Sequence, residues 1–241
     1  MIHLYISTQI DSGCFTITDK EQLHHLTVVL RCRVGDQISL FDPQGIKYLG
    51  TLGAIGKHSA EVSITQKVPA VPVNYSLIVA CAVPKGNRFE GAVEKLTELG
   101  VDSILPMQTA RTVVDLSENT AKKLERWRRL ALNAAEQSQR NRLPQIPAIL
   151  TLDEVLQKTH DYSLKLIPTL EGDLKPLREV IPAAFTGSIV VLIGPEGDFT
   201  PDEIQRAIQA GFIPISLGQT VLRVDTAAIA VAAYIKMALQ E

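Results

Sequence analysis

Short runs of apolar and β-branched residues alternate with polar and turn-forming residues over the first 67 positions, a pattern typical of β-strands. Strands are predicted at Ile2–Ser7, Cys14–Thr18, Gln37–Phe41, Tyr48–Ile55 and Ala60–Thr65. The turn Asp42-Pro43-Gln44-Gly45 joins the middle pair as a hairpin, and a short helix with a basic exit is predicted at His24–Arg33. A small all-β module of this length favours a barrel.

A stiff connector, Val68-Pro69-Ala70-Val71-Pro72, follows this module, because proline favours extended backbone in its neighbours. Beyond it, apolar runs alternate with segments of helical spacing, which indicates a parallel sheet covered by helices. The predicted strands are Leu77–Val83, Val101–Leu105, Leu164–Ile167, Ile189–Ile193 and Ile213–Leu217. The sequence thus predicts a β-barrel domain at residues 1–70 and an α/β domain at residues 73–241.

Helices are predicted at Arg88–Leu99, Glu118–Arg140 and Thr226–Leu239, with another between Thr200 and Gly211. The start of that last helix is well marked. Thr200 suits the N-cap, Pro201 the first helical position, and Glu203 completes a capping box.

The run Ser188–Ile193 is apolar enough for a buried strand, and it ends abruptly in Gly194-Pro195-Glu196-Gly197. A second such loop, Val221–Ala227, follows the strand that ends near Gly218. Ligands of open α/β sheets bind beyond the carboxyl ends of the strands. Either loop alone would be an ordinary turn. Together, one with a lone carboxylate and one with a lone guanidinium, they predict a ligand site.

The formal net charge of −2 conceals an uneven distribution. Residues 122–142 carry seven basic and two acidic side chains, whereas residues 143–241 carry seven basic and twelve acidic ones. The basic side chains are Lys122, Lys123, Arg126, Arg128, Arg129, Arg140 and Arg142. A local basic surface is sufficient to attract a polyanion. The alternative, a solvated helix face without a partner, stays open on this segment alone.

Several classes of protein are disfavoured. No apolar run has the length of a membrane span, and no signal segment opens the chain, so a cytoplasmic protein without a membrane partner is expected. Cys14, Cys32 and Cys81 are scattered, and His24-His25 lacks a carboxylate cluster, so neither disulfides nor a metal are expected. The chain has neither a GxGxxG nor a Walker A motif, which speaks against a dehydrogenase or a P-loop enzyme.

Six segments, in order along the chain, resemble the RsmE family of 16S rRNA uridine-N3 methyltransferases in the SPOUT superfamily. They are Val28–Arg31 with Gly35-Asp36, Glu94–Val101, Ala135–Arg140, Leu143-Pro144, Ile193–Gly197, and Leu217-Gly218 with Leu222-Arg223 and Thr226-Ala227. The chain departs from the family in three places. The family usually has a glycine at Asp198 and a glutamate at Ala110, and it has Arg-Ile-Leu-Arg-Thr-Glu where this chain has Thr220-Val221-Leu222-Arg223-Val224-Asp225.

The resemblance implies a PUA-like β-barrel followed by a trefoil-knotted α/β domain, a homodimer, and S-adenosylmethionine as the cofactor. The cofactor-binding residues that it implies are Leu192, Ile193, Gly194, Pro195, Glu196, Gly197, Leu217, Gly218, Val221, Leu222, Arg223 and Thr226. The implied substrate is 16S rRNA within the 30S subunit, with no DNA partner. The residues expected to bind RNA are Arg31, Arg33, Lys85, Arg88, Arg111, Arg140 and Arg142.

Methylation of uridine N3 requires loss of the N3 proton, so the site needs a base, or a cation that favours the uridinate. Arg223 is the candidate cation, and Glu196 or Asp225 the candidate proton acceptor. Alternatively, Glu196 and Arg223 pair with each other and only hold the two loops together.

Two rival functions remain. A 2′-O-ribose methyltransferase of the same superfamily typically has an Asn-containing run where this chain has Leu222-Arg223-Val224-Asp225. A non-catalytic RNA-binding protein would not need both cofactor loops.

Overall fold

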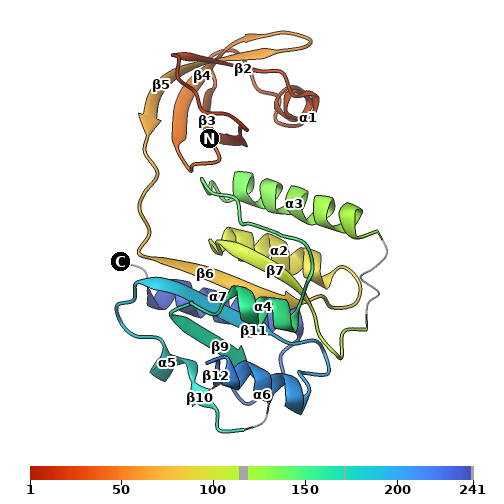
Figure 1. Ribbon diagram of the computed structural model, residues 1–241. Helices are drawn as coiled ribbons and strands as arrows, with labels where there is room; N and C mark the ends of the chain where they lie inside the picture. Colours follow the sequence, from red (N-terminus) through yellow and green to blue (C-terminus); the bar gives the residue numbers. More distant parts are fainter. Residues whose placement is uncertain (114–118, 171, 240–241) are drawn as a thin grey trace. The chain divides into compact units, whose positions relative to one another are not determined.

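The computed structural model describes residues 1–113, 119–170 and 172–239, and the chain forms two compact units (Figure 1). The first unit comprises Met1–Pro72 together with Ala135–Leu143, and the second comprises Val73–Ala134 together with Pro144–Glu241. Each unit has its own apolar core.

The first unit is built on a five-stranded sheet of order β1-β3-β4-β5-β2. Its strands are β1 (Ile2–Tyr5), β2 (Cys14–Ile17), β3 (Gln37–Phe41), β4 (Lys47–Ile55) and β5 (Ala60–Val68). β1 pairs with β3 in parallel, and the other pairs are antiparallel. The predicted hairpin is confirmed: the Asp42 carboxylate accepts hydrogen bonds from the backbone N–H groups of Gln44 and Ile46 and so fixes the β3–β4 turn.

The helix of this unit lies earlier than predicted. It begins as α1 (Lys20–His24) and continues as one π-helical turn, η1 (His25–Val29). Asp19 sets the start, because its carboxylate accepts a hydrogen bond from the backbone N–H of Gln22. The backbone of Arg31, with φ of +53°, is left-handed and prevents the helix from reaching Arg33.

Residues 135–143 pack on the sheet of the first unit, although the sequence placed them in the second domain. The Nε2 of His3 donates to the backbone carbonyl of Arg140 at 3.2 Å. The backbone N–H of Tyr5 donates to the Glu136 carboxylate at 3.0 Å. The His3 ring is buried, stacks on Phe41 and reaches the Ser39 hydroxyl through Nδ1 at 2.7 Å. His3 thus joins two stretches that are far apart in the sequence.

We expect the contribution of His3 to stability to decrease as the pH falls from 7.5 to 5. Burial lowers the pKa of His3 below its ordinary value of 6.5, so the unfolded chain takes up a proton that the folded chain does not. The free energy of unfolding, measured in urea for the wild type and His3→Gln, should therefore differ less at pH 5 than at pH 7.5. A difference that is independent of pH would show that the pKa of His3 is the same in the folded and unfolded states.

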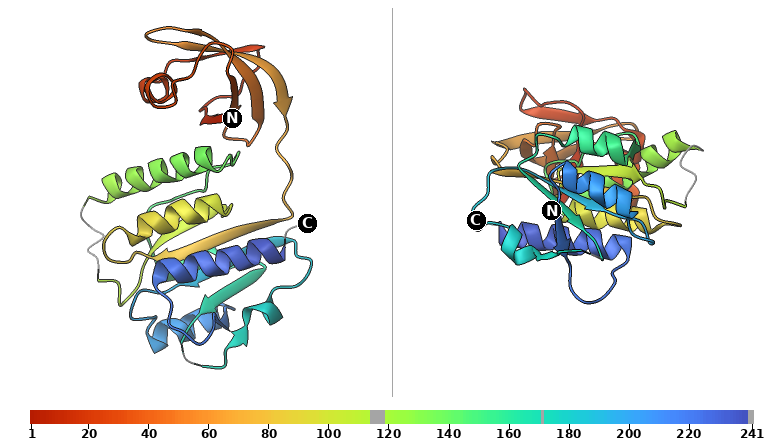
Figure 2. Two further views of the ribbon diagram at one scale, coloured as in Figure 1. Left: turned by 180° about the vertical axis from the view of Figure 1, so that it is seen from behind. Right: turned by 60° about the horizontal axis from the view of Figure 1, so that its bottom comes forward.

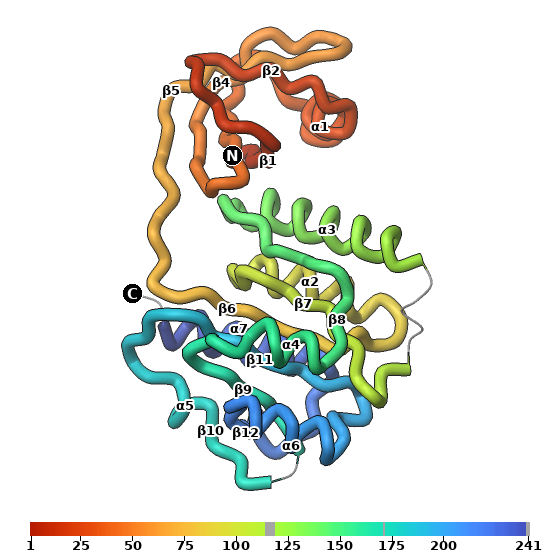
Figure 3. The backbone as a smooth tube through the Cα atoms, viewed as in Figure 1, coloured from red at the N-terminus to blue at the C-terminus, as the bar shows by residue number. Residues whose placement is uncertain are grey.

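The second unit contains a seven-stranded sheet, parallel throughout, of order β10-β12-β9-β11-β6-β7-β8 (Figure 3). Its strands are β6 (Tyr75–Ala82), β7 (Ser103–Gln108), β8 (Leu150–Thr151), β9 (Leu164–Pro168), β10 (Lys175–Pro176), β11 (Gly187–Ile193) and β12 (Ile213–Ser216). The helices are α2 (Arg88–Glu98), α3 (Thr120–Gln137), α4 (Leu152–Lys158), α5 (Leu177–Val180), α6 (Pro201–Gln209) and α7 (Val224–Ala238).

Helices cover both faces of this sheet. In β6, Leu77, Val79 and Cys81 point to the core shared with α2 and α7, which lie side by side (Figure 2). The alternate residues Ile78, Ala80 and Ala82 point to the core shared with α4 and α6. Burial on both faces explains why these strands have continuous apolar runs.

Most predicted elements of this unit are confirmed within a few residues, including the Thr200–Glu203 capping box. The helix predicted over Glu118–Arg140 is found over Thr120–Gln137; its first predicted residue lies outside the described residues. It ends there because Gln139 has a φ of +58°. Four elements were not predicted: β8, α4, β10 and α5.

Candidate functional site

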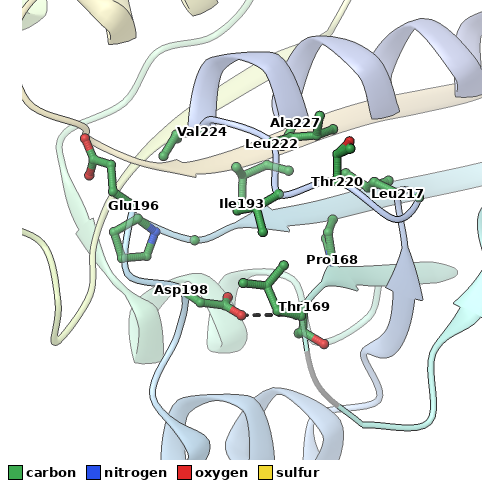
Figure 4. A pocket seen from close by; sticks show the side chains of 15 residues that line it. Pro168, Thr169, Ile193, Glu196, Asp198, Leu217, Thr220, Leu222, Val224 and Ala227 are labelled. Atoms are coloured by element: carbon green, nitrogen blue, oxygen red, sulfur yellow. Dashed lines mark hydrogen bonds between the residues drawn. The ribbon is translucent and has the colours of Figure 1, made fainter.

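A pocket lies at the carboxyl ends of the adjacent parallel strands β12, β9 and β11, beside the start of α7 (Figure 4). This is the edge at which open α/β sheets bind ligands. Its lining comprises Pro168, Thr169, Leu170, Ile193, Gly194, Pro195, Glu196, Asp198, Leu217, Gly218, Thr220, Val221, Leu222, Val224 and Ala227. The two loops singled out in the sequence therefore meet at one pocket.

Eight of the twelve residues that the resemblance implies for the cofactor line this pocket. The other four, Leu192, Gly197, Arg223 and Thr226, do not. Leu192 is fully buried within β11, and the remaining three are exposed beside the pocket. The sequence missed the side formed by Pro168, Thr169 and Leu170. Its signal was present, since β9 was predicted and its carboxyl end lies at the same edge of the sheet.

Apolar groups form much of the pocket, with Ile193, Leu217 and Leu222 prominent in Figure 4. The hydroxyls of Thr169 and Thr220 add polar groups. Gly218 has a φ of +117°, and no atom lies within 4 Å of where its Cβ would be. The uncrowded glycine leaves room for a ligand beside it, while its own backbone N–H donates to the Ser216 hydroxyl at 3.2 Å.

Glu196 is held by the loop that leads into α2. Its carboxylate accepts hydrogen bonds from the Arg88 guanidinium at 3.2 Å and from the backbone N–H of Lys85 at 3.3 Å. In Figure 4 the carboxylate points away from the interior of the pocket. The alternative that Glu196 pairs with Arg223 is therefore wrong, because Glu196 pairs with Arg88.

Arg223 is the N-cap residue of α7 and is exposed, between the pocket-lining Leu222 and Val224. No ion pair engages its guanidinium within residues 1–113, 119–170 and 172–239. The structure thus leaves a cation available at the edge of the pocket.

Asp225 lies in the first turn of α7, and its Oδ1 is buried without a hydrogen-bond partner in the described structure. Burial, together with the negative charges of Asp225 and Glu196, raises the pKa of the Cys81 thiol to about 12. The thiol therefore stays protonated, and both candidate carboxylates are close enough to act on it. A buried carboxylate oxygen that receives no hydrogen bond from the protein is available to accept a hydrogen bond or a proton.

Known proteins show the same combination of domains. The RNA methyltransferase domain family matches residues 71–236, and the RNA methyltransferase PUA domain family matches residues 17–65. Ribosomal RNA small subunit methyltransferase E of Synechocystis is 37% identical over 231 residues, covering 91% of this chain and 71% of that protein. The protein of that name from Mycobacterium bovis is 32% identical over 227 residues, covering 93% and 87%. The chain belongs to the ribosomal RNA small subunit methyltransferase E family.

A solved structure of this family has the same fold. Ribosomal RNA small subunit methyltransferase E from Neisseria gonorrhoeae, bound to S-adenosylmethionine, aligns with a TM-score of 0.88 and 32% identity over 99% of this chain and 98% of that one. The resemblance to the family is therefore confirmed, as are the parallel α/β sheet and a PUA-type first module.

The basic residues expected to bind RNA in this family member fall into two groups. Lys85, Arg88 and Arg111 lie in the second unit around the loop 196–199, where the Arg111 guanidinium donates to the carbonyls of Gly197 and Phe199. Arg88 and Arg111 thus hold that loop through their side chains, whereas Lys85 contacts it through its backbone N–H. Arg31, Arg33, Arg140 and Arg142 lie in the first unit, and their contacts with RNA stay a prediction.

We expect the double substitution of Arg140 and Arg142 by alanine to weaken binding to 16S rRNA and to reduce its salt dependence. Each lost phosphate contact should make the negative slope of log K against log salt shallower by roughly one. Binding can be measured by fluorescence anisotropy from 50 to 300 mM KCl, with Lys158→Ala as a control outside the basic segment. Unchanged affinity across the series would make this segment a solvated face only.

Proposed function

We propose that this protein is an S-adenosylmethionine-dependent methyltransferase that methylates N3 of a specific uridine in the 16S rRNA of the small ribosomal subunit. The observation that carries the proposal is the pocket at the ends of β9, β11 and β12, in a chain of this family. Both predicted loops contribute to that pocket, and the exposed Arg223 lies beside it.

The residues present fit S-adenosylmethionine. Apolar side chains such as Ile193 and Leu222 suit the adenine, and the free space at Gly218 leaves room for it beside the backbone. The described residues of the lining include no lysine, arginine or histidine, in keeping with a cofactor that carries no phosphate. When bound, S-adenosylmethionine supplies an electrophilic methyl group.

The acceptor nitrogen makes the larger demand on the protein, because uridine N3 carries a proton. We assign Arg223 to stabilising the uridinate, since its guanidinium is exposed at the edge of the pocket and forms no ion pair with another described residue. Asp225 is the better proton acceptor, because one of its oxygens is buried without a donor, whereas Glu196 already accepts two hydrogen bonds. Glu196 is then a positioning residue that holds the loop between β11 and α6.

Recognition of the rRNA falls to the PUA-type module and the arginines of the first unit. A folded RNA target would be bound by its phosphates and by a single-stranded loop whose bases are unstacked. The assembled 30S subunit is the proposed substrate, in the cytoplasm.

The protein is proposed to act as a homodimer. Support comes from the exposed side of α7, where Thr226, Ala230, Tyr234 and Met237 recur at helical spacing without a charge among them. Met237 is 68% exposed and Tyr234 is 39% exposed. A second copy would cover this stripe. We expect sedimentation equilibrium to give twice the chain mass of 26.3 kDa, and Ala230→Glu to give a monomer.

A trefoil knot in the second unit is likewise proposed. The chain passes from β11 over β9 to β12, and then returns through Leu217–Leu222 to α7, which contacts β6 and β11. In a trefoil knot the last helix passes through a loop formed earlier in the chain, and for this the chain must return past β9.

The proposed function is tested by incubating the protein with S-adenosylmethionine and 30S subunits from a strain that lacks this methyltransferase. Nucleoside mass spectrometry should then detect N3-methyluridine in the 16S rRNA, and less of it when protein-free 16S rRNA is the substrate. Methyl transfer to a ribose 2′-hydroxyl would support the rival enzyme class. Tight RNA binding without any methylation would support a non-catalytic RNA-binding protein.

A further inference from the structure

Asp198 has an unusual backbone conformation for a residue with a side chain. Its φ is +61°, in the left-handed region that glycine adopts freely and other residues adopt at a cost. It lies in the loop between β11 and α6, where its backbone N–H donates to the carbonyl of Pro195 at 3.0 Å. A left-handed residue that lines a pocket is a reason to ask what its side chain does there.

The Asp198 carboxylate links two sides of the pocket. One oxygen accepts a hydrogen bond from the backbone N–H of Leu170 at 3.1 Å, and the other accepts one from the backbone N–H of Phe199 at 2.8 Å. Leu170 follows β9, whereas Asp198 follows β11, and both residues line the pocket (Figure 4). The carboxylate therefore fixes the Leu170 backbone relative to the loop that contains Gly194 and Glu196.

The same carboxylate also determines the charge of the pocket. Glu196 and Asp198 are the charged residues of its lining, and both are acidic. The charge of Glu196 is compensated by Arg88, and its carboxylate points away from the interior. Asp198 has no cationic partner within the part of the chain that the structure describes. A negative charge without a protein counter-charge favours a cationic ligand.

We propose that Asp198 is a specificity-determining residue of the cofactor pocket. Its carboxylate holds the Leu170 side of the pocket in place and makes the pocket prefer S-adenosylmethionine, whose sulfonium is positive, over S-adenosylhomocysteine, whose sulfur is neutral. This inference rests on the proposed function and extends it to the exchange of product for fresh cofactor. Because the neutral product would bind less tightly than the cationic cofactor, it would dissociate without a conformational change of the protein.

The test is isothermal titration calorimetry with S-adenosylmethionine and S-adenosylhomocysteine on the wild type, Asp198→Asn and Asp198→Gly. Asparagine tolerates the left-handed conformation, and its one amide oxygen can still accept from Leu170, although the bond from Phe199 is lost. It should lower the affinity for S-adenosylmethionine about three- to tenfold, the size of a partly screened charge interaction, and leave the affinity for S-adenosylhomocysteine unchanged. Glycine removes both the charge and the link, so it should weaken the binding of both ligands.

Thermal melting checks that Asp198→Gly is folded at the titration temperature, because glycine relieves the left-handed strain but loses both hydrogen bonds of the carboxylate. Gln139→Gly, at another left-handed position with φ of +58°, is the matched control and should leave both affinities unchanged. An unchanged ratio of the two affinities in Asp198→Asn would overturn the assignment of Asp198. A wild-type protein that binds neither ligand would instead overturn the proposed function.

Discussion

Arg223→Lys is expected to lower the single-turnover rate of methyl transfer about a hundredfold or more while leaving S-adenosylmethionine and rRNA bound. Arg223 caps α7 beside the pocket and has no ion pair in the described residues, so removing its guanidinium breaks no contact that holds the fold. Lysine keeps the charge but loses the planar, bidentate geometry. A rapid-quench experiment with saturating enzyme and 30S subunits measures the rate of this step.

The pH dependence of the methyl-transfer rate distinguishes a catalytic role of Arg223 from a structural one. If Arg223 stabilises the uridinate, a higher pH should partly rescue Arg223→Lys, because more uridine then ionises without help. Arg178→Lys, an exposed position in α5, is a matched control that should leave the rate unchanged. Loss of cofactor affinity and an earlier melt, with a residual rate indifferent to pH, would make Arg223 a structural residue of the loop.

Gly194→Val is expected to abolish measurable binding of S-adenosylmethionine. A Cβ at Gly194 would lie 3.0 Å from two ring carbons of Phe199 and 3.3 Å from Oδ1 of Asp198. Phe199 is buried and cannot move aside cheaply, so the loop itself must shift into the pocket. Overpacking of this kind typically costs about 1–3 kcal/mol of stability, so titrations should be run well below the melting temperature.

Gly197→Val supplies the matched control in the same loop. A Cβ at Gly197 would meet only the Arg111 side chain, at 3.5 Å, and Gly197 does not line the pocket. Its substitution should therefore reduce cofactor affinity far less than Gly194→Val does. Equal losses in the two variants would show that the loop responds as a whole to any added bulk.

The sequence predicted those elements that a short stretch of residues determines by itself. β3 was predicted at Gln37–Phe41, where it is found, because an apolar run and a strong turn define it. α6 followed from its capping box. The same signature, Thr151 with Glu154, begins α4 and could have been used. β8 and β10 have two residues each, too few for any periodicity.

The two loops of the site could be predicted from the sequence, but the elements that meet them could not, because these depend on the order of the strands in the sheet. The loops after β11 and β12 were recognised from their glycines and isolated charges. Their contact with Pro168–Leu170 arises because β9 lies between β11 and β12, and no local pattern encodes that order. The Arg88–Glu196 ion pair, between residues 108 positions apart, is hidden from sequence reading for the same reason.

The two-part composition of the first unit has a consequence for synthesis of the chain. Residues 1–72 leave the ribosome before residues 135–143, which complete the unit. At roughly 5–20 residues per second, the intervening stretch takes about 3–12 s to translate. Throughout that interval His3 and Tyr5 lack their partners at Arg140 and Glu136. The nascent first module is therefore incomplete until much of the second has emerged, and the two must mature together.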